Sequence, residues 1–312
     1  MEAFFKFGEN YINEVIKPLI PNANLGWFIN RSYYLFGPGL FNNSIYERKL
    51  DEESYFFHFT SISSLLDIIR SKTIRMSDFN SFSDNFELTY ANNNLVENPS
   101  EFKEYKSCLF ALSMCEESVE NLQNDYLWEN YGDNHRGVCI KLKFVKQKSI
   151  LNDFYLGKII YKDTNQILEL EELKKRHKDF ENKYGEAIDN LDEILLTVCS
   201  MYKKAIPYKD ENEIRLLAYI HKSENYIHTN SRSPIRHKYN SKKDLIEYFL
   251  ELELESEIEN ENKDKRYCLP YLSIDSIILG SDCFRESISK LRRVIEYEFE
   301  DSFKRELIIY YK

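Results

Sequence analysis

Residues Tyr55–Ser77, YFFHFTSISSLLDIIRSKTIRMS, combine a strand pattern with a helix pattern and so indicate the fold class. Its opening letters, YFFHF, are typical of a strand. Thr60 or Ser61 is then expected to cap a helix, because apolar residues recur after it at helical spacing. These apolar residues are Ile62, Leu65, Leu66, Ile68 and Ile69. The letters IRM that follow predict a short strand, so the stretch forms an α+β unit.

Outside this stretch, strands and helices are interleaved through connections of irregular length. The predicted strands are CLFALSM (108–114), GVCIKLKF (137–144) with KIIY (158–161) as its neighbour, EIRLLAYI (213–220) and SIDSIILG (273–280). The predicted helices are one or two surface helices within 166–204, an acidic helix from Ser241 and Asp244 to about Asn260, and a helix over 285–299. The irregular connections favour a mixed or mainly antiparallel sheet flanked by helices.

The composition excludes several large classes of nucleotide-binding enzyme. The chain has 312 residues but only 9 glycines, and it contains no G-x-G-x-x-G, G-x-x-x-x-G-K-[ST] or G-x-S-x-G motif. Dinucleotide-binding sheets, P-loops and nucleophile elbows need these glycines for tight turns and for close approach to phosphate. Any nucleotide is therefore expected to be held by side chains.

The charge balance argues against a protein that coats nucleic acid. The chain has 42 Lys and Arg against 52 Asp and Glu, a net charge of −10. Nucleic-acid binding depends on clustered basic residues. The basic segment that would support it contains Arg232, Arg236, His237, Lys238, Lys242 and Lys243. We therefore do not favour nucleic acid as a partner.

The sequence shows no pattern of export, membrane insertion or metal binding. The six cysteines form no C-x-x-C pair, and MEAFFKFGEN lacks the basic and apolar regions of a signal peptide. No apolar run approaches the roughly 18 residues of a membrane span. No H-E-x-x-H motif occurs. These features predict a reduced, cytoplasmic protein without a membrane span or a metal site.

Residues 1–50 form an aromatic-rich N-terminal extension to a domain over 51–312. Between Pro18 and Ile45 the only charged residue is Arg31, and six Trp, Tyr and Phe side chains crowd among Asn, Gly and Pro. Aromatic side chains this dense are expected to be shielded from water by contact with another surface. Two interpretations are open: it wraps around the main domain, or it contacts a protein partner, a second copy or a membrane surface.

The first of three signals that could carry chemistry is His58-Phe59-Thr60, at the end of the first predicted strand. Residues two apart on a strand point the same way. His58 and Thr60 could therefore bind one ligand, such as a ribose diol or an amide. The alternative is a structural histidine followed by a capping threonine.

The second signal is the pattern W-x-x-Y-x-x-x-H-x-G just before the strand 138–144. It comprises Trp128, Tyr131, His135 and Gly137. Trp128 and Tyr131 lie three residues apart and share a helix face. Tyr131 could offer its ring to a planar heterocycle, and the alternative is an aromatic core cluster.

The third signal opens the strand 213–220. Glu211, Glu213 and Arg215 share one face by period 2, whereas the other face is apolar. Charged side chains on a strand need either a solvated sheet edge or a functional site. Both interpretations remain open from the sequence.

Taken in order, these signals resemble the bacterial domain-of-unknown-function family 2971 over about 55–280. The matching segments are YFFHFTSISSLLDIIRSKTIRMS, FSDNFEL, LFALS, LWENYGDNHRGVCIKL, YKDENEIRLL and SIDSIILG. The chain departs from the family pattern at Ser83, Asn85, Tyr208 and Ile214.

That family in turn resembles the ADP-ribosyltransferase superfamily, whose signature is a His-x-Ser/Thr, a Tyr and a Glu in this order. The resemblance implies a split mixed or antiparallel sheet, with a helical insertion at about 165–204, that binds NAD in its cleft. It implies that His58 holds a ribose hydroxyl, that Thr60 contacts the nicotinamide side and that Tyr131 stacks on the nicotinamide ring. Glu213 would bond the ribose 2′-OH and stabilise the cationic transition state.

Further residues receive roles from the same resemblance. Glu211 would orient or deprotonate the acceptor, and Arg215 would either keep the carboxylates ionised or bind the pyrophosphate. Asp84 and Glu87 are further polar candidates, with loop capping as the alternative.

The function implied is an NAD-dependent ADP-ribosyltransferase that modifies an unknown macromolecular acceptor, as a toxin or an anti-phage effector would. Two alternatives stay open. One is an NAD glycohydrolase that uses the same site with water as the acceptor. The other is a non-enzymatic interaction module that docks through residues 1–50.

Overall fold

The computed structural model describes most of the chain and leaves several segments undescribed. The described residues are 2–27, 33–36, 39–51, 54–82, 88–92, 106–144, 154–164, 166–185, 191–220, 235–241, 244–254, 270–298 and 307–309.

The opening unit forms as its periodicity predicts. It consists of β3 (Tyr55–Thr60), α2 (Ile62–Ser71) and β4 (Thr73–Asp78). Ser61, and not Thr60, is the N-cap, because its side chain accepts a hydrogen bond from Ser64 N at 3.1 Å. Leu65 and Ile69 are buried on the inner face of the helix. Lys72 ends the helix in the left-handed region, with φ 53°.

A ten-stranded sheet forms the centre of the fold, with β5 (Leu109–Glu116) at its middle. The main path runs β11-β12-β4-β5-β3-β6-β13-β14, and β10 and β7 continue from β5 on its other side. The new strands are β6 (Val138–Phe144), β7 (Phe154–Lys158), β10 (Glu213–Tyr219), β11 (Ile235–Asn240), β12 (Leu245–Glu253), β13 (Leu272–Leu279) and β14 (Leu307–Ile309). Pairing among these described strands is antiparallel except between β13 and β14. The α+β class with a mixed, mainly antiparallel sheet is thus confirmed.

The sheet branches at β5. One edge of β5 pairs with β10 along seven residues, from the partners Glu213 and Cys115 to Tyr219 and Leu109. The other edge pairs with two strands in turn: residues 110–111 pair with β4, and residues 115–116 pair with β3. Residues 112–114 therefore lie where β3 and β4 diverge. This opening between two strands is the feature that positions the candidate site.

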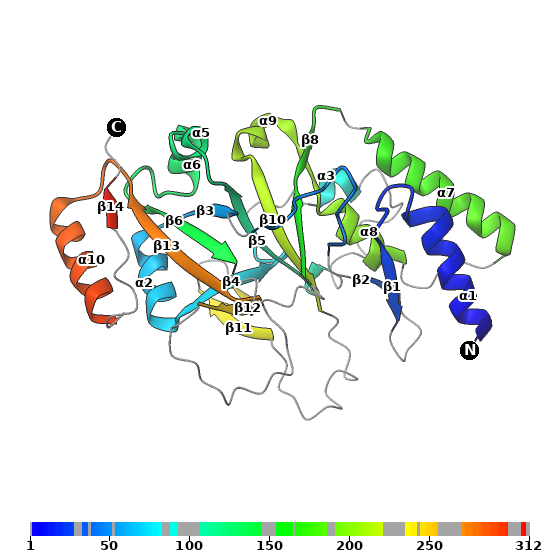
Figure 1. Cartoon of the computed structure of the whole chain (residues 1–312), viewed down its shortest axis with the longest axis horizontal. Helices are drawn as coiled ribbons and strands as arrows, with labels where there is room; N and C mark the ends of the chain where they lie inside the picture. Colours follow the sequence, from blue (N-terminus) through cyan, green and yellow to red (C-terminus); the bar gives the residue numbers. More distant parts are fainter. Residues whose placement is uncertain are drawn as a thin grey trace, which may run out of the picture.

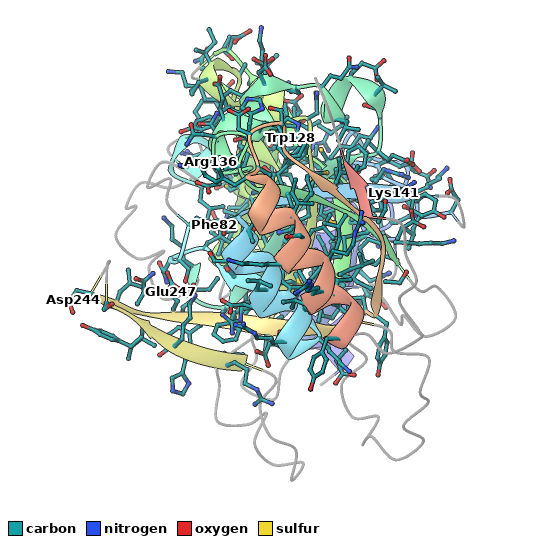
Figure 2. The ribbon with its side chains drawn as sticks, turned by 90° about the vertical axis from the view of Figure 1, so that its left-hand side faces the viewer. Phe82, Trp128, Arg136, Lys141, Asp244 and Glu247 are labelled. Atoms are coloured by element: carbon teal, nitrogen blue, oxygen red, sulfur yellow. The ribbon has the colours of Figure 1, made fainter. Side chains whose placement is uncertain are left out.

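Two sequence-based predictions of secondary structure are wrong. The predicted acidic helix after Ser241 is instead β12, which forms a hairpin with β11 and also pairs with β4. Its residues alternate along the strand, so that Leu250, Leu252 and Leu254 enter the core, and this burial outweighs the local capping pattern. Figure 2 shows the hairpin projecting from the body of the protein, with Asp244 at its tip.

KIIY is also placed differently from the prediction. It does not pair with β6: β7 pairs with β10, and β8 (Ile160–Lys162) forms a separate parallel pair with β9 (Tyr202–Lys204). Residues 145–153, which connect β6 to β7, lie outside the described part.

The N-terminal extension packs against the helical insertion. It contains α1 (Glu2–Tyr11), the π-helix η1 (Ile12–Ile16), β1 (Asn24–Trp27) and β2 (Tyr33–Phe36). Figure 1 shows α1 beside α7 (Leu168–Tyr184), with α8 (Leu191–Cys199) between them and the sheet. Tyr11, Phe41 and Tyr46 are buried in the same cluster as residues of α7, α8 and β10. This packing is what the wrapping interpretation expects, and a partner contact through this segment stays a prediction.

The helical insertion is not simply a surface feature. Only α7 has the exposed, charged face that the sequence suggests, whereas the described side chains of α8 are all buried. The insertion therefore contributes to the core behind the sheet and leads directly into β9.

The remaining helices are short or lie at the other end of the sheet. They are α3 (Thr89–Asn92), α5 (Val119–Leu122), α6 (Asp125–Asn130), α9 (Ala205–Tyr208), the 3-10 turn η3 (Lys209–Glu211) and α10 (Arg285–Glu298). The predicted helix at 285–299 is thus confirmed as α10, which lies beside α2 in Figure 1. In the part of the chain that the structure describes, no helix is both long and apolar enough to cross a membrane.

We expect Gly137→Ala to lower the free energy of unfolding by roughly 1–3 kcal/mol, because overpacking forces the backbone to move. A Cβ at Gly137 would lie 2.3 Å from Thr60 O and 2.8 Å from Gly132 O, both backbone atoms. Urea unfolding measures the loss. Gly185→Ala is the control: its Cβ would meet nothing within 4 Å, so only its left-handed φ of 71° opposes it. The net cost should be about 1 kcal/mol or less, because alanine also reduces the freedom of the unfolded chain. Equal losses in both variants would contradict the packing argument.

Candidate functional site

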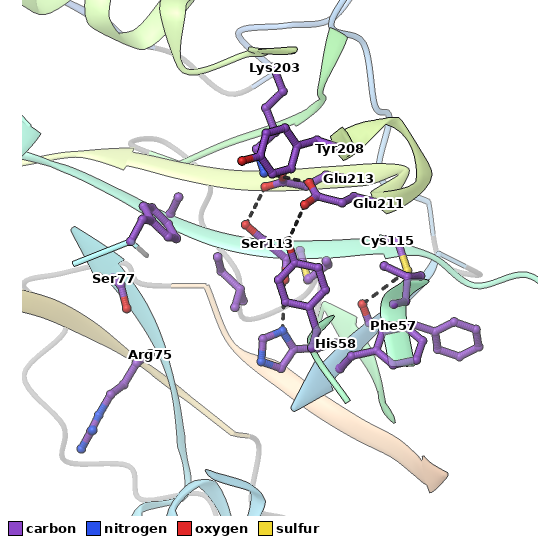
Figure 3. Close-up of a pocket in the computed structure, with 17 residues that line it drawn as sticks. Phe57, His58, Arg75, Ser77, Ser113, Cys115, Lys203, Tyr208, Glu211 and Glu213 are labelled. Carbon is purple, nitrogen blue, oxygen red and sulfur yellow. Dashed lines mark hydrogen bonds and ion pairs between the residues drawn. The ribbon is translucent and has the colours of Figure 1, made fainter. Parts of the chain in front are cut away.

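A cavity of about 260 Å³ lies at the branch of the sheet. It is bounded by β3, β4 and β5, by the end of α6, and by the segment from β9 to the start of β10. Its lining residues include His58, Arg75, Ser77, Ser113, Cys115, Tyr131, Lys203, Tyr208, Glu211 and Glu213, together with apolar side chains (Figure 3). One cavity thus brings together candidates from all three sequence signals.

His58 bridges the opening between β3 and β5. Its Nδ1 lies 3.0 Å from the carbonyl oxygen of Ser113, on the stretch of β5 that neither β3 nor β4 pairs. Because a carbonyl can only accept, Nδ1 must carry the proton. Burial lowers the pKa of His58, so the ring is neutral near pH 7 and Nε2 is left as an acceptor. Thr60 does not line the cavity, so the structure does not bring the predicted pair to one ligand.

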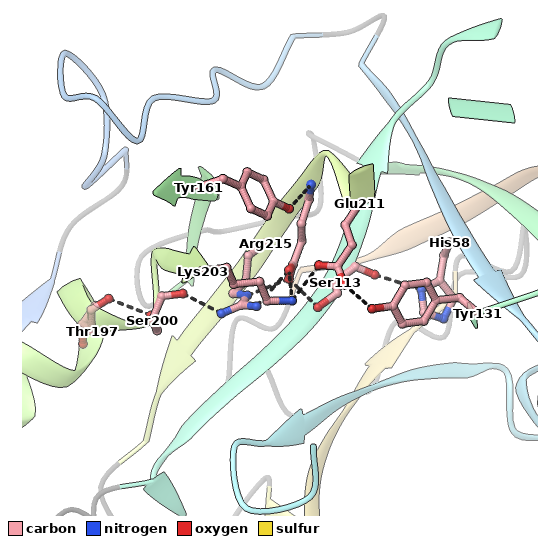
Figure 4. A network of polar contacts seen from close by, with 10 residues as sticks. His58, Ser113, Tyr131, Tyr161, Thr197, Ser200, Lys203, Glu211 and Arg215 are labelled. Atoms are coloured by element: carbon pink, nitrogen blue, oxygen red, sulfur yellow. Dashed lines mark hydrogen bonds and ion pairs between the residues drawn. The ribbon is translucent and has the colours of Figure 1, made fainter. Parts of the chain in front are cut away.

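Glu213 is held by a dense set of donors. Oε1 accepts from Ser113 Oγ at 2.5 Å and from Arg215 Nε at 2.7 Å. Oε2 contacts Arg215 Nη2 at 2.9 Å and Lys203 Nζ at 2.7 Å. A carboxylate has about four acceptor sites, so these contacts fill those of Glu213. Figure 4 shows the resulting network.

Arg215 is an internal partner of Glu213 and not a cavity residue. It is fully buried, and its Nη1 donates to Ser200 O at 2.5 Å, just beyond the C-terminus of α8. Its guanidinium also lies over the Phe79 ring. Of its two predicted roles, the geometry matches the one that keeps the carboxylate ionised, and it places Arg215 away from any ligand in the cavity.

The solvated-edge interpretation of this strand is wrong. β10 lies between β5 and β7, and all seven of its residues are buried. The two charges on its inner face are tolerated because each is paired and hydrogen-bonded.

Glu211 lies at the cavity in a different setting from Glu213. Its Oε1 accepts a hydrogen bond from the Tyr131 hydroxyl, and its Oε2 accepts one from Lys203 Nζ at 2.8 Å. Among the described residues these are its two polar contacts, so acceptor capacity remains. Lys203 therefore bridges the two glutamates.

The two carboxyl groups have opposite pKa shifts. Burial raises the pKa of Glu211, and the neighbouring Glu213 charge adds to this against the opposing charge of Lys203. Burial alone would also raise the pKa of Glu213, but the charges of Arg215 and Lys203 outweigh it and hold that pKa well below its ordinary value. Neighbouring carboxyls with divergent pKa values are a pattern of acid–base sites. The surroundings thus favour the ionised form of Glu213 and the protonated form of Glu211.

The residues of the W-x-x-Y-x-x-x-H-x-G motif occupy two different places, since two of them pack in the core and one lines the cavity. Trp128 is fully buried and donates from Nε1 to Leu122 O at 2.6 Å, and the His135 ring stacks on it. Tyr131, the C-cap of α6, is 45% exposed and lines the cavity. The core-cluster interpretation therefore describes Trp128 and His135, whereas Tyr131 is available to a ligand.

Several members of this network have no clear signal in the sequence. Lys203 falls at the end of a predicted helical stretch, and Tyr161, which accepts a hydrogen bond from Glu213 N at 3.0 Å, falls in an ordinary predicted strand. Neither position carries a recognisable pattern. Ser113 has a detectable signal that sequence reasoning missed, as the one polar residue in CLFALSM. The candidates Asp84 and Glu87 lie outside the described residues.

The comparison with protein families gives one match. Residues 127–216 match the family described as "Protein of unknown function (DUF2971)". The DUF2971 match contains Tyr131, Lys203, Glu211 and Glu213. Of the other segments in which the sequence resembles this family, three lie before residue 127 and one lies after residue 216. No curated protein and no solved structure matches the chain.

Proposed function

We propose that this protein is an NAD-dependent ADP-ribosyltransferase. The observation that supports the proposal best is that His58, Tyr131, Glu211 and Glu213 line one cavity, although they come from distant parts of the chain. Their order along the sequence is the one that the superfamily resemblance requires.

The proposed reaction breaks the bond between ribose C1′ and the nicotinamide nitrogen. Nicotinamide leaves with the bonding electron pair and becomes neutral, and C1′ passes through an oxocarbenium-like state, as in glycoside hydrolysis. An acceptor atom then forms a new bond to C1′ and loses its proton. The protein must orient the sugar, place negative charge near C1′ and accept that proton.

The described side chains match these needs. Nε2 of neutral His58 is an acceptor for a ribose hydroxyl, and the exposed ring of Tyr131 offers a face for nicotinamide. Glu211 has acceptor capacity and a raised pKa, which suits a group that takes a proton from the acceptor. Glu213, whose acceptor sites are filled, would act through its charge and by holding Lys203 in place.

The size of the cavity limits what it can enclose. Small-molecule sites commonly measure about 300–1,000 Å³, and this cavity of about 260 Å³ lies just below that range. It therefore suits the nicotinamide–ribose half of NAD, with the remainder extending along the cavity wall.

The test is to incubate the protein with NAD labelled in the adenylate part, with and without a cell lysate. A transferase is expected to label a macromolecule in the lysate and to release nicotinamide. Free labelled ADP-ribose without lysate would indicate the glycohydrolase alternative. Neither label nor nicotinamide release by the wild-type protein would overturn the enzyme proposal and leave the interaction module.

A further inference from the structure

The cavity has a second polar region on β4, opposite the glutamates. Ser77 pairs with Ala111 of β5, and Arg75 lies two residues before it on the same face. If β4 had stayed paired with β5, Arg75 would face Ser113. Because the strands diverge there, Arg75 instead lines the far wall of the opening.

Arg75 forms no close ion pair with any carboxylate in the described part of the chain. Lys203, the other cation in the cavity lining, touches carboxylate oxygens at 2.8 and 2.7 Å. Arg75 Nε, by contrast, is 3.9 Å from Glu251 Oε1, a distance well beyond that of a charge-assisted hydrogen bond. Glu251 is shared with Arg236, whose Nε lies 3.9 Å from the other oxygen. Glu251 is therefore not a close, exclusive partner of Arg75.

The Arg75 side chain is also held in place. Its guanidinium lies over the Phe249 ring, with Cζ 4.3 Å from the ring centroid, so its N–H groups remain available around its edge. Next to it, the Ser77 hydroxyl makes no hydrogen bond to any residue that the structure describes. Figure 3 shows Arg75 and Ser77 on one side of the cavity and the two glutamates on the other.

We infer that Arg75 and Ser77 form an anion subsite that binds the diphosphate group of a nucleotide ligand. Arginine binds phosphate oxygens through paired N–H groups, and a serine hydroxyl adds a further donor. The subsite rests on the proposed function, because it takes the anionic half of the same ligand whose ribose lies near His58. It replaces Arg215 as the phosphate contact, since Arg215 is buried behind Glu213.

The test is isothermal titration calorimetry with ADP, which carries the diphosphate but no nicotinamide. We expect the wild type to bind ADP and Arg75→Gln to bind it about tenfold or more weakly, because a hydrogen bond to a charged group is lost. Arg176→Gln is the matched control: the Arg176 side chain is 40% exposed, close to the 39% of Arg75, but it lies on α7 and does not line the cavity. It should change the ADP dissociation constant by less than about twofold. Unfolding midpoints of both variants check that they fold.

The outcomes separate the subsite from the proposed function. Equal ADP affinity of Arg75→Gln and wild type, or no ADP binding by the wild type, would overturn the subsite. Arg75-dependent ADP binding by a protein that never releases nicotinamide from NAD would support the subsite and overturn the transferase proposal.

Discussion

Arg215→Leu is expected to lower the free energy of unfolding by about 3–5 kcal/mol, the range typical of a buried ion pair that loses one partner. Arg215 and Glu213 are both buried, with side-chain exposures of 1% and 2%. Without Arg215, the Glu213 carboxylate would stay in the core with Lys203 as its remaining cation, and Ser200 O would lose a donor. Urea unfolding followed by circular dichroism measures the change.

Two further variants make this prediction specific. Arg136→Leu removes an arginine that is 53% exposed and pairs with Asp133, itself 45% exposed, and it should cost at most about 1 kcal/mol. The double variant Arg215→Leu/Glu213→Leu should recover much of the loss, because it removes the unpaired charge. A loss in Arg215→Leu no larger than that in Arg136→Leu would show that the pair is not important for stability.

The pKa shifts add opposite pH dependences to the stability of the fold. The pKa of Glu213 is lowered on folding, so its contribution is present above the ordinary carboxyl pKa and is lost as pH falls through the folded value. The pKa of Glu211 is raised, so its contribution is present below the ordinary value and is lost as pH rises through the folded value. As the pH is lowered into the acidic range, the free energy of unfolding of Glu213→Gln should therefore fall less steeply than that of the wild type. Urea unfolding at a series of pH values measures this difference.

Glu211→Gln is expected to reduce the rate of ADP-ribose transfer from NAD to the acceptor by at least about a hundredfold, the lower end of what a positioned acid–base group contributes. The amide keeps the shape of the side chain but cannot accept a proton at the cavity. For the wild type, the rate should rise with pH through the raised pKa of Glu211, because the ionised form is the base. A single-turnover assay over a pH series measures both effects.

The control for this prediction is Glu117→Gln, which changes a partly exposed glutamate paired with Lys141 at 2.7 Å, outside the cavity lining. It should leave the rate within about twofold of the wild type. Rates are normalised to the folded fraction, because Glu211 is also part of a buried network. A folded Glu211→Gln variant with wild-type activity would contradict the role of Glu211 as the proton acceptor.

Local sequence patterns predict those parts of the fold whose periodicity is matched by burial. The strand–helix–strand unit at Tyr55 follows from a switch between the two periods and from a serine cap. The shared face of Glu213 and Arg215 on β10 follows from alternation along the strand. The same reasoning fails for β12, where an acidic segment with a capping pattern becomes a strand because β4 and β11 offer it partners.

Local patterns therefore suffice to predict the α+β class, the main strands and the residue types that could carry chemistry. Which of these residues meet depends on the packing of distant segments: Lys203 joins the two glutamates, Thr60 lies outside the cavity, and Arg215 turns inward. Alternation along a strand specifies only a face, whereas a site depends on where strands distant in sequence diverge. That divergence is set by the pairing of β5 with both β3 and β4, which no local pattern records.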